Sequence, residues 1–103
     1  MRPQGVRFSQ ASISHRFSDG TTIDNLAEAL RAGRVKPQDV PPLRLVERNG
    51  VYYTLDNRRL EAFRRAGIDI PWCLATPEEM RDEAWKFTTT NDGMSVTVRG
   101  HSL

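Results

Sequence analysis

The chain has 103 residues, of which 27% are charged and 38% hydrophobic, with a formal net charge of +2 and a pI near 9.1. This length predicts a single domain over residues 1–103, and no apolar run is long enough for a membrane span or the hydrophobic part of a signal peptide. The one cysteine, Cys73, excludes an intrachain disulfide and a cysteine-cluster metal site. Its apolar neighbours predict a buried structural thiol without cysteine chemistry.

The charges are distributed unevenly along the chain. Thirteen of the fifteen basic residues are arginine, and six arginines stand against three acids between Arg44 and Arg65. From Asp69 to Asp92 the balance reverses, with six acids against Arg81 and Lys86. Such an asymmetric field suits one anionic partner bound on one face, although a solvated mixed surface would give a weaker version of the same asymmetry.

The first part of the chain predicts a short strand and then a long loop. Met1–Gly5 has the character of an unstructured leader, and the alternation of apolar and polar residues in Val6–Ser9 predicts a strand. Gln10–Gly20 is polar and predicts a loop that Ile13 and Phe17 anchor to the core.

A helix is predicted next. Thr21 or Thr22 would cap it, and Gly33 would end it. Between them, apolar residues recur at the spacing of one helical face, which is the pattern of a helix packed on a core: Ile23, Leu26, Ala27 and Leu30.

A hairpin and a second helix form the centre of the sequence. Leu43–Glu47 and Val51–Leu55 predict two strands, and the Asn49-Gly50 pair between them is the strongest short signal for a two-residue hairpin turn. A helix from about Arg58 to Ala66 follows and ends at Gly67.

The last third predicts a strand, a helix and a final strand. Pro71 places the strand Ile70–Leu74 at its start or at an edge of a sheet. Thr76 and the acids after it open a third helix, and Ser95–Arg99 predicts a last strand. The succession of elements is that of an α+β domain with a small mixed sheet and three helices.

The junction of the hairpin with the second helix predicts an anion site. Asp56-Asn57 is a polar turn, and Arg58 and Arg59 open the helix that follows. The free N–H groups and the positive end of the helix dipole favour phosphate, and arginine adds a planar fork that binds phosphate oxygens. The alternative is that Asp56 or Asn57 only caps the helix and the arginines are solvated.

Other residues are weaker candidates. His15 and Arg16 lie in the predicted loop, and Lys86 and the threonines at 88 to 90 would add donors to an anion site. Six carboxylates would hold a divalent ion through water and phosphate: Asp56, Glu61, Glu78, Glu79, Asp82 and Glu83. The last four belong to the third helix and are more typical of a solvated face. His15 and His101 are far apart, and no metal-ligand, Ser-His-Asp, Cys-His or P-loop spacing appears.

Three stretches together resemble one superfamily. RFSQASI, IDNLAEALRAG and PPLRLVERNGVYYTLDNRRLEAFRRAGIDIP follow the order and spacing of ParB/sulfiredoxin-like domains over about residues 6–75. In that superfamily a Gly-Glu-Arg-Arg-like box binds nucleotide phosphates or a nucleic-acid backbone, and Asp56-Asn57-Arg58-Arg59 correspond to it. In the chromosome-partition proteins of this superfamily the box begins with Gly-Glu, so Asp-Asn here argues against their CTP switch. Sulfiredoxins have a reactive cysteine beside the box, and its lack here argues against sulfinic-acid reduction.

The DNRRL form of the box also resembles ParB-like domains at the C-termini of bacterial polymorphic toxins. This resemblance implies a nuclease or nucleotide phosphohydrolase that a larger secreted parent protein delivers to the cytoplasm of the cell on which it acts. It also implies a cognate immunity protein as partner. A chain that begins directly before its first strand is typical of such a C-terminal module.

Two main hypotheses follow. In the enzyme, Asp56 holds Mg²⁺ with a nucleotide or orients water, His15 is the general acid or base and Arg16 stabilises developing charge, while the phosphate is bound by Asn57, Arg58, Arg59, Lys86 and Thr88. In the alternative, the same arginines belong to a non-catalytic module that binds a nucleotide or a nucleic-acid backbone. A plain interaction domain would leave the arginines without a role.

Overall fold

The computed structural model describes residues 1–100, so His101 lies outside the described range. The helices within this range are α1 (Ile23–Ala32), α2 (Asn57–Ala66) and α3 (Pro77–Asp82). The strands are β1 (Arg7–Phe8), β2 (Ser12–Ser14), β3 (Leu43–Arg48), β4 (Val51–Thr54), β5 (Trp72–Leu74) and β6 (Thr97–Arg99). Three 3₁₀ turns complete them: Pro3–Gly5, Pro37–Asp39 and Ala84–Lys86.

Four strands form one mixed sheet in the order β1-β4-β3-β5. β3 and β4 are the antiparallel hairpin, with Val46 opposite Tyr53, while β1 runs parallel to β4 and β5 parallel to β3. The hairpin turn has φ values of +52° at Asn49 and +78° at Gly50, as the Asn-Gly pair predicts. The predicted α+β class, with a small mixed sheet and three helices, is therefore confirmed.

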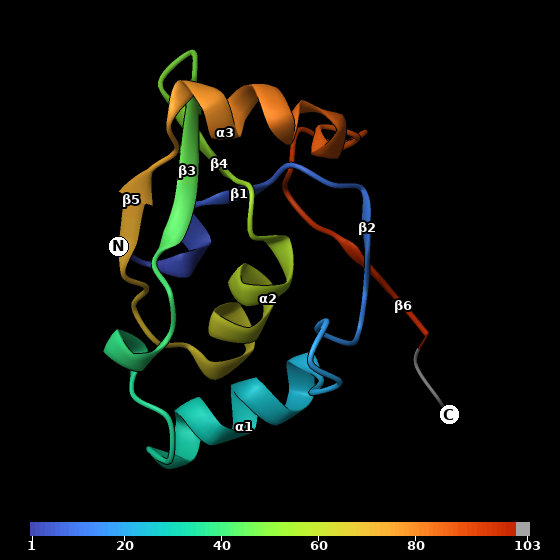
Figure 1. The fold of residues 1–103 in the computed structure, drawn as a ribbon. Helices are drawn as coiled ribbons and strands as arrows, with labels where there is room; N and C mark the ends of the chain where they lie inside the picture. Colours follow the sequence, from blue (N-terminus) through green and yellow to red (C-terminus); the bar gives the residue numbers. More distant parts are fainter. Residues whose placement is uncertain (101–103) are drawn as a thin grey trace.

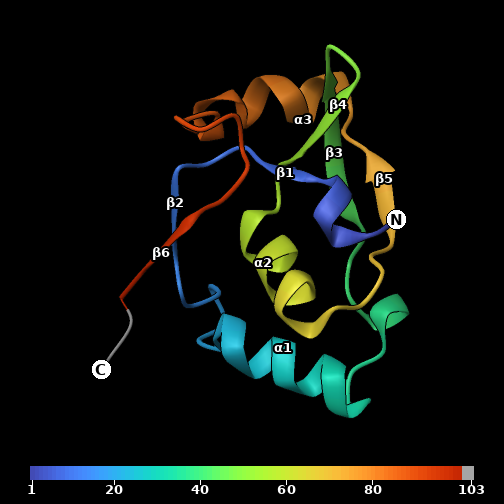
Figure 2. The ribbon, with the colours of Figure 1, turned by 180° about the vertical axis from the view of Figure 1, so that it is seen from behind.

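Helix α2 lies at the centre of the molecule. It lies between α1 and α3, beside the four-stranded sheet (Figures 1 and 2). Leu60 and Phe63 of α2 are at most 1% exposed. They share one apolar core with Val6, which directly precedes β1, and with residues of β1, α1 and β3, namely Phe8, Leu30, Leu43 and Leu45.

The ends of the helices follow the sequence signals. Thr22 caps α1 through a capping box with Asn25, and Thr76 caps α3 in the same way with Glu79. Gly67 ends α2 in the left-handed conformation with φ +69°. None of the helices in residues 1–100 has the length and apolar character needed to span a membrane.

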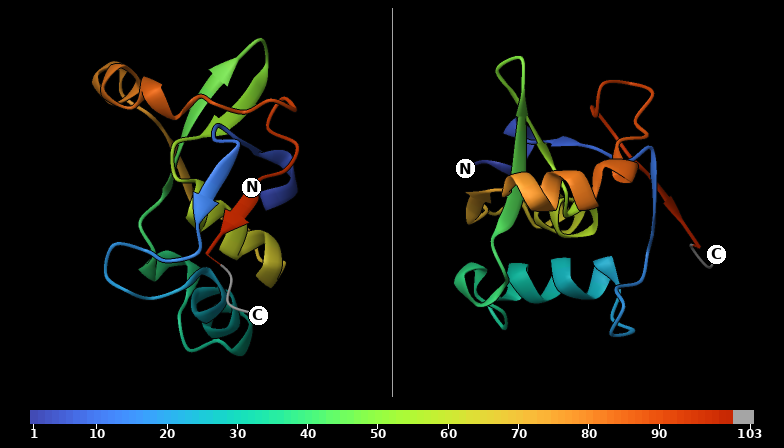
Figure 3. Two further views of the ribbon diagram at one scale, coloured as in Figure 1. Left: turned by 90° about the vertical axis from the view of Figure 1, so that its right-hand side faces the viewer. Right: turned by 45° about the horizontal axis from the view of Figure 1, so that its top comes forward.

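The segment Gln10–Gly20 is not the plain loop that its composition predicts. Residues 12–14 form β2, which pairs in parallel with β6 as a separate two-stranded ribbon, with Ile13 beside Val98. Figure 3 (left) shows the two strands side by side and pointing in the same direction. Only a partner more than 80 residues away makes this segment a strand, so local pattern could not show it.

Two further predictions were wrong. Met1–Gly5 is not an unstructured leader, because it contains a 3₁₀ turn and the Met1 carbonyl accepts a hydrogen bond of 2.9 Å from the N–H of Ile70. Cys73 is exposed. Since β5 is the edge strand of the sheet, its apolar sequence is not enclosed by neighbours on both sides, and Trp72 and Leu74 are exposed with it.

Candidate functional site

A cleft of about 400 Å³ lies over the first turn of α2. Its described lining comes from the β4–α2 junction, from β2 and the loop after it, from the turn Ala84–Lys86 and from β6. Four cationic side chains and one carboxylate face it: Arg58, Arg59, Lys86, Arg99 and Asp56. The structure thus brings together Asp56, Asn57, Arg58, Arg59 and Lys86 of the predicted site.

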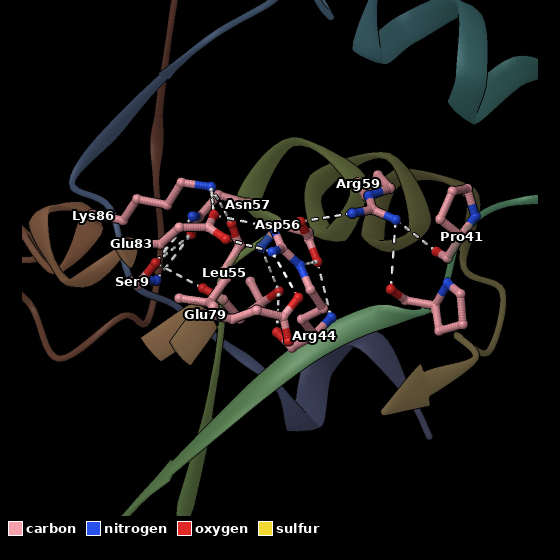
Figure 4. A network of polar contacts seen from close by, with 12 residues as sticks. Ser9, Pro41, Arg44, Leu55, Asp56, Asn57, Arg59, Glu79, Glu83 and Lys86 are labelled. Carbon is pink, nitrogen blue, oxygen red and sulfur yellow. Dashed lines mark hydrogen bonds and ion pairs between the residues drawn. The ribbon is translucent and has the colours of Figure 1, made fainter. Parts of the chain in front are cut away.

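Arg44, which the sequence analysis did not select, organises the ion pairs beside this cleft. From β3 its guanidinium reaches Asp56 at 2.7 Å, Glu79 at 3.2 Å and Glu83 (Figure 4). The acids of the third helix were expected on a solvated face, which holds for the exposed Glu78 and Asp82 but not for the half-buried Glu79 and Glu83. Both carboxylates attach the α3 segment to the sheet instead.

Both carboxylate oxygens of Asp56 are bound within this network. Its Oδ2 accepts hydrogen bonds from the N–H of Arg44 at 2.9 Å and from its Nε at 3.1 Å. Its Oδ1 accepts from Nη2 of Arg44 at 2.7 Å and pairs with Nη2 of Arg59 at 2.6 Å. Burial raises the pKa of Asp56, but the hydrogen bonds from Arg44 and the positive charges of Arg59 and Arg44 together outweigh it and hold that pKa below its usual value.

This arrangement bears on the expected roles of Asp56. A carboxylate offers about four acceptor positions, and the contacts from Arg44 and Arg59 occupy as many. The carboxylate of Asp56 therefore has no acceptor position left with which to bind Mg²⁺ or to accept a proton in this structure. No group of three or more His, Cys, Asp or Glu residues in the described chain is placed to hold a metal ion.

Arg58 and Arg59 differ although they are adjacent. Arg59 pairs with Asp56 and donates to the carbonyl of Pro41 at 2.7 Å, so it links α2 to the start of β3 (Figure 4). Arg58 donates to the carbonyl of Arg16 at 3.1 Å and lies 5.9 Å from the ring centroid of Phe17. No carboxylate among residues 1–100 pairs with Arg58.

Asn57 fastens the start of α2 to the segment after β1. Its Oδ1 accepts from the N–H of Ser9 at 2.9 Å and from that of Gln10 at 3.3 Å, and its Nδ2 donates to the side chains of both residues. Thr88 serves the same segment, because its Oγ1 accepts from the N–H of Ala11 at 3.0 Å, and it does not line the cleft. The amide of Asn57 is thus used in holding the fold.

Lys86 lines the cleft from the turn Ala84–Lys86. Its Nζ donates to the carbonyl of Leu55 at 2.8 Å and pairs with Glu83 at 2.6 Å. The position of Lys86 is therefore fixed by the residue that ends the hairpin and by the Arg44 network.

His15 and Arg16 lie beside the cleft but do not line it. Nδ1 of His15 is 3.0 Å from the carbonyl oxygen of Arg99, and Nη1 of Arg16 donates to the carbonyl of Gly20 at 3.2 Å. Arg99 itself lines the cleft, and sequence reasoning missed it. Arg99 reaches the cleft through the pairing of β6 with β2, and the local sequence pattern does not predict this pairing.

The charges of the network and the cleft do not cancel completely. Arg44, Arg59 and Lys86 balance the carboxylates of Asp56, Glu79 and Glu83 in number. Arg58 and Arg99 remain without a carboxylate partner in residues 1–100. The cleft therefore has an excess of two positive charges, and no described side chain caps the N–H groups of α2's first turn beside it.

A second hollow of about 490 Å³ also contains two arginines, but they are used differently. Arg7 pairs with Asp92 at 2.6 Å. Arg64 lies against the Phe8 ring and donates to the carbonyls of Pro3, Val6 and Met94. These contacts hold the N-terminal segment and the 92–94 turn in place, so this hollow is the weaker candidate.

Comparison of the chain with family models, with curated proteins and with solved structures gives no match.

Proposed function

We propose that the chain binds the phosphate of a nucleotide or of a nucleic-acid backbone in the cleft over the first turn of α2. The observation that carries this proposal is the position of Arg58 and Arg99, which face one cleft without a carboxylate partner in the described chain. The uncapped N–H groups of α2 lie beside them and add donors for an anion.

The charge of a phosphate matches this cleft. The terminal phosphate of a nucleotide carries about −1.5 to −2 charges at neutral pH. Two adjacent backbone phosphodiesters, with about one negative charge each, carry the same total, and the cleft has an excess of two positive charges. A carboxylate brings only one negative charge and two oxygens, so it would use fewer of the donors. The resemblance of Asp56-Asn57-Arg58-Arg59 to a phosphate-binding box supports the same ligand class.

Binding can be measured by fluorescence anisotropy with labelled single-stranded DNA and RNA, with pyrophosphate and nucleoside triphosphates as competitors. Arg58→Ala should weaken binding at least tenfold, because loss of one charged hydrogen-bond set costs about 1.5–3 kcal/mol. Arg34→Ala is the matched control, since Arg34 is an exposed arginine that does not line the cleft. Equal affinities of the two variants would contradict the proposal.

Phosphodiester or nucleotide cleavage by a toxin module is a second candidate. The contact of His15 with Arg99 favours it, because it places an imidazole next to a residue of the cleft. His15 is the residue that would then exchange a proton with the substrate, through a movement toward the cleft. The resemblance to toxin C-termini supports this candidate, and an immunity protein would cover the Arg58 side of the cleft with carboxylates.

Cleavage is tested by incubating the purified chain with DNA, RNA and the four nucleoside triphosphates, with and without Mg²⁺. Expression in a bacterial cytoplasm should arrest growth, and both His15→Ala and Arg58→Ala should relieve the arrest. Normal growth at high expression, with no cleavage of any substrate, would leave a binding module as the function.

A further inference from the structure

Trp85 is a large apolar side chain that lines the cleft while remaining 67% exposed. Trp85 lies in the turn Ala84–Lys86, and the two residues that follow it hold this turn in place. Lys86 donates to the Leu55 carbonyl, and Phe87 packs edge-on against Tyr53 with ring centroids 6.0 Å apart. The chain is thus anchored directly after a tryptophan that has not been buried.

The indole lies close to one cation of the cleft, the ammonium group of Lys86. Nζ of Lys86 is 5.7 Å from the centroid of the Trp85 ring. The same Nζ is 2.8 Å from the carbonyl oxygen of Leu55, which directly precedes the N-cap of α2 (Figure 4). Trp85 is therefore one side chain away from the first turn of α2. On the β2 side, Ile13 and Phe17 add apolar surface to the same cleft.

We propose that Trp85 stacks on a nucleobase whose phosphate is held by Arg58 and Arg99. This inference rests on the proposed function and specifies its ligand as a base-bearing phosphate instead of a bare anion. Every base offers a π-face, so stacking on an aromatic side chain supports binding of nucleotides or single strands without selecting a sequence. Inorganic phosphate or a sugar phosphate would leave the exposed indole unused.

The second tryptophan provides the control. Trp72 lies on β5, where its ring is 6.2 Å from that of Tyr52, and it does not line the cleft. Trp72→Phe leaves Trp85 as the only tryptophan of the chain, so the fluorescence of this variant reports on the cleft alone.

In the Trp72→Phe background, AMP, a short single-stranded oligonucleotide, ribose 5-phosphate and pyrophosphate are titrated, and fluorescence and affinity are recorded. Base-bearing ligands should quench the fluorescence of Trp85, and ribose 5-phosphate should not. Trp85→Ala should reduce the ratio of the affinities for AMP and ribose 5-phosphate about tenfold, while Trp85→Phe should keep most of it.

The outcomes separate the two proposals. If pyrophosphate and ribose 5-phosphate bind but the affinity ratio is unchanged in Trp85→Ala, stacking is wrong and phosphate binding stands. If no ligand binds the Trp72→Phe protein, the proposed function fails and stacking falls with it. Quenching by AMP would identify a nucleotide ligand, and quenching by the oligonucleotide alone would identify a single strand.

Discussion

Arg44 and Asp56 are joined by three hydrogen bonds, one from the backbone N–H of Arg44 and two from its guanidinium, between 2.7 and 3.1 Å long. These bonds connect β3 with the N-cap residue of α2, two residues after the end of β4. The direction of α2's first turn, and with it the position of Arg58, therefore depends on the ion pair of Asp56 with Arg44, which itself does not line the cleft.

Replacing Arg44 should destabilise the fold strongly. Arg44→Ala would leave the carboxylate of Asp56, 6% exposed, with one cation, would remove the cation that pairs with Glu79, and would leave Glu83 with Lys86 alone. Breaking a buried pair by removing one partner costs about 3–5 kcal/mol, and urea unfolding measures it. Arg34→Ala, whose partner lies 3.8 Å away on the surface, should change the free energy of unfolding by less than about 0.5 kcal/mol. Equal losses in both variants would contradict this account.

Stability should fall in acid. Burial raises the pKa of Glu83, but hydrogen bonds from Arg44 and Lys86, together with their positive charges, outweigh it and lower this pKa like that of Asp56. A lowered folded-state pKa means that the unfolded chain takes up protons first, so the stabilisation is complete above about pH 5 and is lost as the pH falls below about 4. Urea unfolding between pH 3 and 7 measures this slope, and Glu83→Gln should reduce it. An unchanged slope would show that Glu83 does not contribute.

Gly93 should be less replaceable than Gly67, although both have positive φ. A Cβ at Gly93 would lie 2.3 Å from the carbonyl oxygen of Phe8, whereas one at Gly67 meets no atom within 4 Å. Gly67→Ala carries only the left-handed strain of about 1–2 kcal/mol, and Gly93→Ala must also displace the β1 backbone. Melting temperatures of the two variants test this order, and an equal loss would contradict it.

The adjacent arginines should separate binding from stability. Arg58→Ala should weaken phosphate binding with little change in melting temperature, because Arg58 has no carboxylate partner in residues 1–100. Arg59→Ala should lower the melting temperature as well, since Arg59 pairs with the buried Asp56. Calorimetric titration and thermal unfolding of both variants measure the difference. A loss of stability in Arg58→Ala would show that this residue is structural.

Local chemistry was sufficient to predict most elements. Thr22 and Gly33 bound α1, Asn49-Gly50 forms the hairpin turn, and α2 starts one residue before the predicted Arg58. These features depend on residues within a few positions of one another. The grouping of Arg58 and Arg59 at a helix start follows from the same local pattern.

The features that could not be predicted depend on long-range pairing. Arg44 appears in the sequence as one charge in a strand, and only the packing of α3 against the sheet gives it Glu79 and Glu83 as partners. Arg99 faces the cleft because β6 pairs with β2. Trp85 lines the same cleft as Arg99 only because α3 packs against the sheet and β6 pairs with β2.

The most direct test of phosphate binding is an amide nuclear magnetic resonance titration of the labelled chain with pyrophosphate and with AMP. Binding at the cleft predicts that the amide signals of Arg58 and Arg59, in the first turn of α2, shift together with those of Lys86 and Arg99. Signals around Arg7 and Arg64, in the second hollow, should stay unchanged. Shifts confined to the second hollow, or no shifts at millimolar ligand, would contradict the account.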